Sequence, residues 1–174
     1  DFQATLETKP EKAIKLEKDA LAQIENITAD NARLVSNLHA NLGGLYRMNA
    51  HPDLAREHME KSISLLDQFN LLHINDSIPQ IANYAMFLTE QQEPERGISE
   101  LQKLSGIIKE YHSDECLDYA KVQETLGTIY LMTANLPQAK THFKRAFKIY
   151  EKIWADEPEM IEAKYQEIQE LYPQ

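Results

Sequence analysis

The sequence contains three related segments: Asn41-Leu42-Gly43-Gly44-Leu45-Tyr46, Asn83-Tyr84-Ala85-Met86-Phe87-Leu88 and Thr125-Leu126-Gly127-Thr128-Ile129-Tyr130. Each begins 42 residues after the one before it. The residues that follow recur at the same interval. They are first small (Ala55, Gly97 and Ala139), then bulky (Met59, Leu101 and Phe143), and then Ser62, Leu104 and Ala146. Such a fixed period predicts a protein built from one repeated structural unit.

The repeated unit has the features of two helices joined by a turn. Pro52, Pro94 and Pro137 lie between the two halves of the three units, where proline is compatible with the first turn of a second helix. The small residues Gly43 and Gly127 leave room for the facing helix to approach closely. We therefore predict tight pairs of helices and no strands.

The pattern L-G-x-x-Y followed by A-x-x-x-F-x-x-A resembles the tetratricopeptide repeat, whose usual period is 34 residues. The extra length here falls after Ser62, Leu104 and Ala146, so that the second helix of each unit runs on. This distribution resembles the kinesin-light-chain type of repeat. Residues 112–120 resemble that type's inter-repeat connection, although its His-Pro pair is missing. The resemblance implies an all-α, right-handed superhelix of antiparallel helices.

The register extends to both ends of the chain and predicts eight helices and a single solenoid over 1–174. The predicted helices are 9–27, 31–49, 52–70, 76–91, 94–111, 114–133, 136–155 and 157–172. The predicted units are a half repeat at 1–30, repeats at about 31–75, 76–113 and 114–156, and a half repeat at 157–174. Thr8 is the candidate N-cap of the first helix, with Pro10 in its first turn. Neither end has an obvious capping helix, so we expect a segment of a longer protein.

Composition narrows the possible functions. A hydrophobic content of 43% fits a folded protein, and no apolar run is long enough to span a membrane. The net charge of −10 and the lack of a visible basic cluster argue against nucleic acid as a partner. The single Cys116 suits a reducing compartment, which predicts a cytoplasmic location.

The resemblance implies a concave groove lined by the first helices of the repeats, which would bind a protein or an extended peptide. Side chains opposite the packing face of those helices are then the candidate ligand contacts. They are Asn37, Asn41, Arg47, Asn83, Met86, Lys121, Thr125 and Thr128. The amides of Asn41 and Asn83 can pair with a peptide backbone of any sequence. We expect six of these side chains to share one concave surface and to be largely accessible and unpaired in the free protein: Asn37, Asn41, Asn83, Lys121, Thr125 and Thr128.

The sequence offers few residues for a metal site, a catalytic site or a carboxylate clamp. His58 and His142 lie two periods apart and cannot share a metal ion, and His112 with Cys116 makes neither a zinc site nor an equipped nucleophile. We therefore expect no enzyme activity, metal or cofactor. A carboxylate clamp of the kind that binds chaperone tails is matched only by Asn83 and Lys121. The alternatives are a spacer or oligomerisation arm, or the sensing half of a regulator resembling the bacterial quorum-sensing type.

Overall fold

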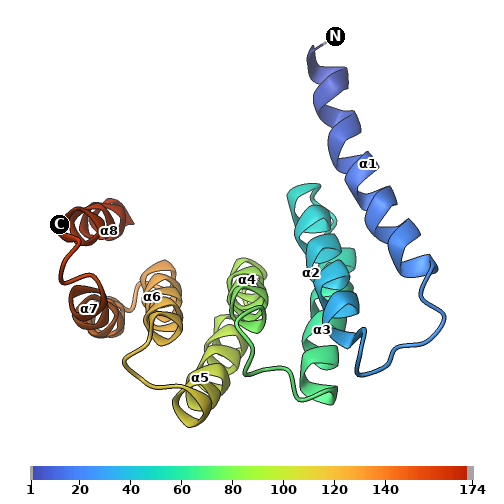
Figure 1. Cartoon of the computed structure of the whole chain (residues 1–174). Helices are drawn as coiled ribbons and strands as arrows, with labels where there is room; N and C mark the ends of the chain where they lie inside the picture. The colour runs from blue at the N-terminus through green and yellow to red at the C-terminus, as the bar shows by residue number, and fades with distance from the viewer. Residues whose placement is uncertain (1, 172–174) are drawn as a thin grey trace. The chain divides into compact units, whose positions relative to one another are not determined.

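The computed structural model describes the backbone of residues 2–171 and the side chains of residues 9–170. This part of the chain is entirely helical between its turns, and its eight helices pack in antiparallel pairs (Figure 1). The helices are α1 (Phe2–Ala22), α2 (Ala32–Met48), α3 (Pro52–Gln68), α4 (Ser77–Glu90), α5 (Pro94–Tyr111), α6 (Leu117–Met132), α7 (Leu136–Ile153) and α8 (Pro158–Leu171). The predicted all-α class and the number of helices are confirmed.

The chain forms two compact units, a first unit of residues 1–84 and a second unit of residues 85–174. In the first unit, α2 packs along α3 and also contacts α1. A Cβ atom placed on Gly43 would lie 2.5 Å from Met59 Cγ and 3.3 Å from the carbonyl oxygen of Ala55. The predicted close contact between the two helices of a repeat is therefore present, and a glycine makes it possible.

In the second unit, α6 packs along α7, and the pairs α5–α6 and α7–α8 are also in contact. Gly127 makes the same kind of contact as Gly43, because a Cβ atom there would lie 2.7 Å from the ring of Phe143. At Gly97 a Cβ atom would lie 2.6 Å from the carbonyl oxygen of Ala85. Small residues thus mark the closest helix contacts in both units.

The core follows the recurring positions of the sequence. Leu42, Tyr84 and Leu126 are 0%, 4% and 1% exposed, which confirms their predicted burial. The corresponding positions on the second helices of the repeats are buried as well: Ala55, Met59, Ser62, Gly97, Leu101, Leu104, Ala139, Phe143 and Ala146. α3, α5 and α7 begin at residues 52, 94 and 136, so that their starts are 42 residues apart.

The turn inside each repeat has a backbone geometry that was not predicted from the sequence. Ala50, Gln92 and Ala134 adopt positive φ angles of 57°, 65° and 57°, in the left-handed region that glycine favours. The amide of the residue that follows each of them returns to a carbonyl five residues back, as in His51 to Tyr46 at 2.9 Å. This closure satisfies carbonyls at the end of the helix, and the next helix begins immediately afterwards.

Two predicted helix boundaries are wrong. α1 begins at Phe2, so Pro10 lies inside the helix and Thr8 is not its cap. Proline has a helical φ and costs one backbone hydrogen bond, which a run of good helix formers on both sides can offset. α1 also ends at Ala22 rather than at residue 27, because Asn31 ties a turn together by accepting from the Thr28 amide at 2.8 Å and donating to the Asn26 carbonyl at 2.9 Å.

Candidate functional site

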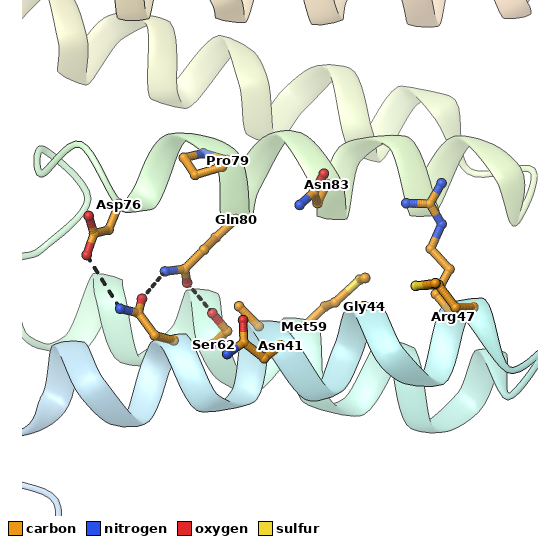
Figure 2. A pocket seen from close by; sticks show the side chains of 12 residues that line it. Asn41, Gly44, Arg47, Met59, Ser62, Asp76, Pro79, Gln80 and Asn83 are labelled. Atoms are coloured by element: carbon orange, nitrogen blue, oxygen red, sulfur yellow. Dashed lines mark hydrogen bonds between the residues drawn. The ribbon is translucent and has the colours of Figure 1, made fainter. Parts of the chain in front are cut away.

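A groove of about 550 Å³ lies between α2 and α4 in the first unit, with α3 at its floor (Figure 2). Four of the predicted ligand contacts line it, namely Asn37, Asn41, Arg47 and Asn83. Its other lining residues are Ala40, Gly44, Met48, Met59, Ser62, Asp76, Pro79 and Gln80. Whether these four residues contact a ligand stays a prediction, and the sequence analysis did not name Gln80 and Asp76, which join the two walls.

A chain of hydrogen bonds fixes the spacing between the walls at one end of the groove. Gln80 on α4 donates from its side-chain amide to Asn37 Oδ1 on α2 at 2.6 Å (Figure 2). The side-chain oxygen of Gln80, Oε1, accepts from the hydroxyl of Ser36 at 2.8 Å and from that of Ser62. Asn37 donates in turn to Asp76 at 3.4 Å. The two buried serines also contact each other, with Ser36 Oγ 3.1 Å from Ser62 Oγ and 3.2 Å from the Ser62 carbonyl oxygen, so Gln80 joins an existing hydrogen-bonded pair.

Asp76 closes this end of the groove with a charge pair. Arg33 Nε donates to the Asp76 carboxylate at 2.6 Å. Hydrogen bonding from Arg33 is the main reason that the pKa of Asp76 is lowered, with a smaller contribution from Asn37. The carboxylate therefore stays ionised at neutral pH and continues to hold Asn37 in place.

The middle of the groove offers the exposed amides of Asn41 and Asn83 from its two walls (Figure 2). Asn41 donates to Glu17 on α1 at 3.0 Å, whereas the Asn83 side chain makes no hydrogen bond to any residue that the structure describes. Beside them, a Cβ atom on Gly44 would meet nothing described within 4 Å, and Met48 is 82% exposed. This part of the groove thus combines two exposed amides, of which only that of Asn41 is bonded to a described residue, with open space and an apolar surface.

The second unit has a smaller pocket at the equivalent place, of about 270 Å³. Lys121 and Thr125 line it, 84 residues after Asn37 and Asn41. The position equivalent to Gln80 is Lys164, which pairs with Glu124 on α6 at 3.2 Å and with Glu167 at 2.6 Å. The ion pair between Lys164 and Glu124 therefore bridges α8 and α6 here, whereas the neutral amides of Gln80 and Asn37 bridge α4 and α2 in the first unit.

Aromatic side chains enclose that ion pair. Tyr150 donates to Glu124 at 2.6 Å, and its ring lies 4.7 Å from the ring of Trp154 and 5.7 Å from Lys164 Nζ. Burial, together with Glu124, raises the pKa of Tyr150. Burial opposes the charge of Lys164, but its bonds to Glu167 and Glu124 raise its pKa overall. The pair is held as part of the packing of α8, and Lys164 is not available to a ligand.

The predicted contacts are not all unpaired, and that expectation is wrong for several of them. Asn37 is fixed by Gln80 and Asp76, and Asn41 is bonded to Glu17. Thr125 and Thr128 donate to carbonyls of their own helix, those of Lys121 and Glu124, as hydroxyls within helices commonly do. Met86 is half-buried on α4 and belongs to the second unit, as do Lys121, Thr125 and Thr128. The prediction that Asn37, Asn41, Asn83, Lys121, Thr125 and Thr128 share one concave surface stays a prediction.

Both units also contain a half-buried histidine contact between the two helices of a repeat. In the first unit His39 and His58 face each other with their Nδ1 atoms 2.9 Å apart, and Tyr46 stacks on His58. Burial, then His58 and Lys61, lower the pKa of His39 to about 4, and burial also lowers the pKa of His58. No group of three or more metal-binding side chains is present among the described residues.

The equivalent contact in the second unit is built from Gln123 and His142. His142 Nδ1 lies 2.9 Å from Gln123 Oε1, and Tyr130 stacks on the imidazole. Burial, with a contribution from Arg145, lowers the pKa of His142. The tyrosine and the second histidine are the same in both units, and only the first partner differs.

The described helices form a helical-repeat protein with a groove between α2 and α4, and one family model matches part of the chain. Residues 77–152 match the family model described as "Tetratricopeptide repeat". The matched segment runs from the start of α4 nearly to the end of α7 and is similar to tetratricopeptide repeats. A search of curated protein sequences found no match.

The fold is also similar to a solved structure, "Crystal structure of BtubC (BKLC) from P. vanneervenii". The TM-score is 0.72 at 20% identity, over 85% of this chain and 58% of that one. The chain therefore spans less than two-thirds of the solved protein, and at this identity the similarity concerns the fold. No described helix is both long and apolar enough to cross a membrane.

Proposed function

We propose that the protein binds an extended peptide, or a flexible segment of another protein, in the groove between α2 and α4. The observation that carries this proposal is the pair of exposed amides, Asn41 and Asn83, on the two walls of one groove. Each amide offers a donor and an acceptor, which suits main-chain recognition. Tetratricopeptide repeats are in general protein-binding modules, which supports the same conclusion.

The length of the groove limits the segment that it can hold. Asn37 and Arg47 are ten residues apart on α2, which corresponds to about 15 Å of helix. An extended chain covers that distance with about four or five residues. The ligand is thus a short stretch of backbone, whose apolar side chains contact Met48 and enter the space beside Gly44.

The alternative is a spacer or oligomerisation arm, which needs no groove ligand. A spacer has no need of an open groove, and so it does not explain why hydrogen bonds from Arg33 to Ser62 fix α2 and α4 on either side of unfilled space. The sensing half of a peptide-responsive regulator is a special case of the proposed function, since it would use the same groove. A cytoplasmic location and the absence of enzyme activity remain predictions.

The test is a selection of binders from a displayed library of random peptides on the immobilised protein. The selected peptides are then measured against Asn41→Ala/Asn83→Ala by fluorescence anisotropy. Loss of several hydrogen bonds should weaken binding by about 1–3 kcal/mol, or roughly five- to 150-fold. Equal affinity for the double variant, or no enrichment of any peptide, would favour the spacer.

A further inference from the structure

A charged pocket of about 260 Å³ lies in the second unit, where the connection between α5 and α6 passes the second half of α7. Tyr119 and Ile149 are its buried lining residues. Its charged lining residues are four basic and two acidic side chains: Lys109, Arg145, Lys148 and Lys152, with Asp114 and Glu115. This basic pocket therefore carries an excess of positive charge in a chain whose net charge is −10.

Two of the four cations bind carboxylates of the chain itself. Lys109 Nζ lies 3.5 Å from Asp114 Oδ2, and Lys152 pairs with Glu115. All four side chains are at least half exposed, so these ion pairs add little to stability and can open to admit a ligand. One edge of the pocket thus already accepts two adjacent carboxylates of a peptide chain.

The other two cations have no carboxylate partner among the described residues. Arg145 donates to the side-chain oxygen of Gln123 at 3.3 Å but forms no ion pair. Lys148 forms neither a hydrogen bond nor an ion pair with any residue that the structure describes. Both side chains are exposed and lie three residues apart on one face of α7. The pocket therefore has positive charge to offer to a further anion.

The basic face of α7 is not a surface that the next repeat of such a stack covers. Its side chains have equivalents on α5, 42 residues earlier: Lys103 for Arg145, Gly106 for Lys148 and Glu110 for Lys152. All three equivalents are exposed, although α6, α7 and α8 follow them in the same unit. Only one of the three is basic, so the positive charge belongs to this repeat and not to the fold.

We propose that the basic pocket binds an acidic segment of another polypeptide, whose carboxylates pair with Arg145 and Lys148 beside Asp114 and Glu115. The carboxylates already present at its edge indicate the chemistry, and the two unpaired cations supply the complementary charge. The net charge of −10 disfavours a long polyanion such as nucleic acid, which the whole chain would repel. The pocket shares no residue with the α2–α4 groove, so this proposal and the proposed function can fail independently.

The test is a titration of the full chain with a blocked tetraglutamate peptide, followed by amide chemical shifts in NMR spectra. A blocked tetraglutamine peptide and inorganic phosphate are the comparison ligands. Tetraglutamate should give saturable shifts at the basic pocket that weaken at high salt. Tetraglutamine should give none, and phosphate should bind at least about tenfold more weakly because it reaches fewer of the cations.

Neutral substitutions on α7 separate the pocket from general electrostatic attraction. Arg145→Gln/Lys148→Gln should weaken tetraglutamate binding about tenfold. Lys148→Gln alone breaks no contact with a described residue and should weaken it about threefold. Lys140→Gln/Lys144→Gln is the matched control, because it removes the same charge from exposed positions of α7 outside the pocket and should change the affinity little.

Neutral substitutions at the edge of the pocket should have the opposite effect. Asp114→Asn/Glu115→Gln releases the two paired lysines and should tighten tetraglutamate binding about tenfold. Asp156→Asn/Glu157→Gln is the control, since it makes the same change of charge at exposed residues outside the pocket.

The proposal is overturned if tetraglutamate does not bind, or if either control pair changes the affinity as much as its partner. Phosphate binding as tight as that of tetraglutamate would also overturn it, because the occupant would then be a small anion. The amide spectrum of each variant checks that it is folded.

Discussion

The α2–α4 groove and the α6–α8 pocket occupy equivalent places in two repeats but are closed in different ways. In the first, Gln80 links the walls through neutral hydrogen bonds at one end and leaves about 550 Å³ open. In the second, Lys164 bridges to Glu124 beneath Tyr150 and Trp154, and about 270 Å³ remains. Equivalent places in two repeats thus hold cavities of different size, because the side chains that bridge and line them differ.

The largest expected effect concerns the two adjacent glycines of α2. Gly43 lies in the contact with α3, whereas Gly44 lies in the groove. Gly43→Leu drives a side chain into Met59 and the Ala55 carbonyl and should lower the free energy of unfolding by about 1–3 kcal/mol or more. Gly44→Leu enters open space and gains helix propensity, so it should be neutral or stabilising by up to about 1 kcal/mol. Urea denaturation compares the two. Similar changes in both variants would contradict the assignment of Gly43 to packing and Gly44 to the groove.

The ion pair of the second unit should matter to stability more than an ordinary surface pair. Lys164→Ala leaves Glu124, whose side chain is 18% exposed, without its cation. We expect a loss of about 1–3 kcal/mol in the free energy of unfolding, smaller at high salt. Lys140→Ala is the control, because an exposed residue without an ion pair usually contributes within about 0.5 kcal/mol. A loss no larger than in that control would mean that Lys164 does not seal the pocket.

The histidine contacts should make the first unit the more sensitive to acid. Because the pKa of His39 is lowered from 6.5 to about 4, the unfolded chain takes up its proton first. The contribution of neutral His39 to the free energy of unfolding is therefore fully present above pH 6.5 and is lost as the pH falls towards 4. A doubly protonated His39–His58 pair also loses its hydrogen bond. Protonated His142, by contrast, can still donate to Gln123.

The variant His39→Gln gives the first unit the arrangement found in the second. It should reduce the loss of stability between pH 7.5 and pH 5, measured by denaturation at each pH. Gln123→His should increase that loss. If His39→Gln is as acid-sensitive as the wild type, the histidine pair does not control the difference.

The smallest expected effect is that of the groove amides on folding. Asn41→Ala/Asn83→Ala should change the free energy of unfolding by no more than about 0.5 kcal/mol, because both side chains are exposed. Thermal unfolding followed by circular dichroism measures this. A large loss would show that the amides serve the fold, with Asn41 acting through its bond to Glu17.

The sequence predicted the helices and their contacts well, because burial and close packing leave a periodic trace. Positions such as Leu42, Ala55 and Gly127 repeat because each repeat buries the same face. The turns at Ala50 and Gln92 were harder to foresee, since the left-handed residue is not a glycine. Pro10 misled the prediction of the first helix because proline is compatible with both a helix start and, at some cost, a helix interior.

The candidate site was predicted only in part. Helical periodicity placed Asn37, Asn41 and Asn83 on one side of their helices, and all three line the groove. Periodicity cannot say what lies opposite, and so it missed that Gln80 and Asp76 would bind Asn37. It also treated Lys121 and Thr125 as the equals of Asn37 and Asn41, whereas the effect of Lys164 on that pocket depends on a contact with Glu124 from a different helix.

The central claim is that the space beside Gly44 receives the ligand, and a matched pair of glycine variants tests it most directly. Gly44 and Gly106 both lie on helices, and a Cβ atom at either would meet nothing described within 4 Å, but only Gly44 lines the groove. The affinity of a library-selected peptide should fall at least about tenfold in Gly44→Leu, a cost of about 1.4 kcal/mol, and should be unchanged in Gly106→Leu. Wild-type affinity in Gly44→Leu, with the variant folded, would contradict the account.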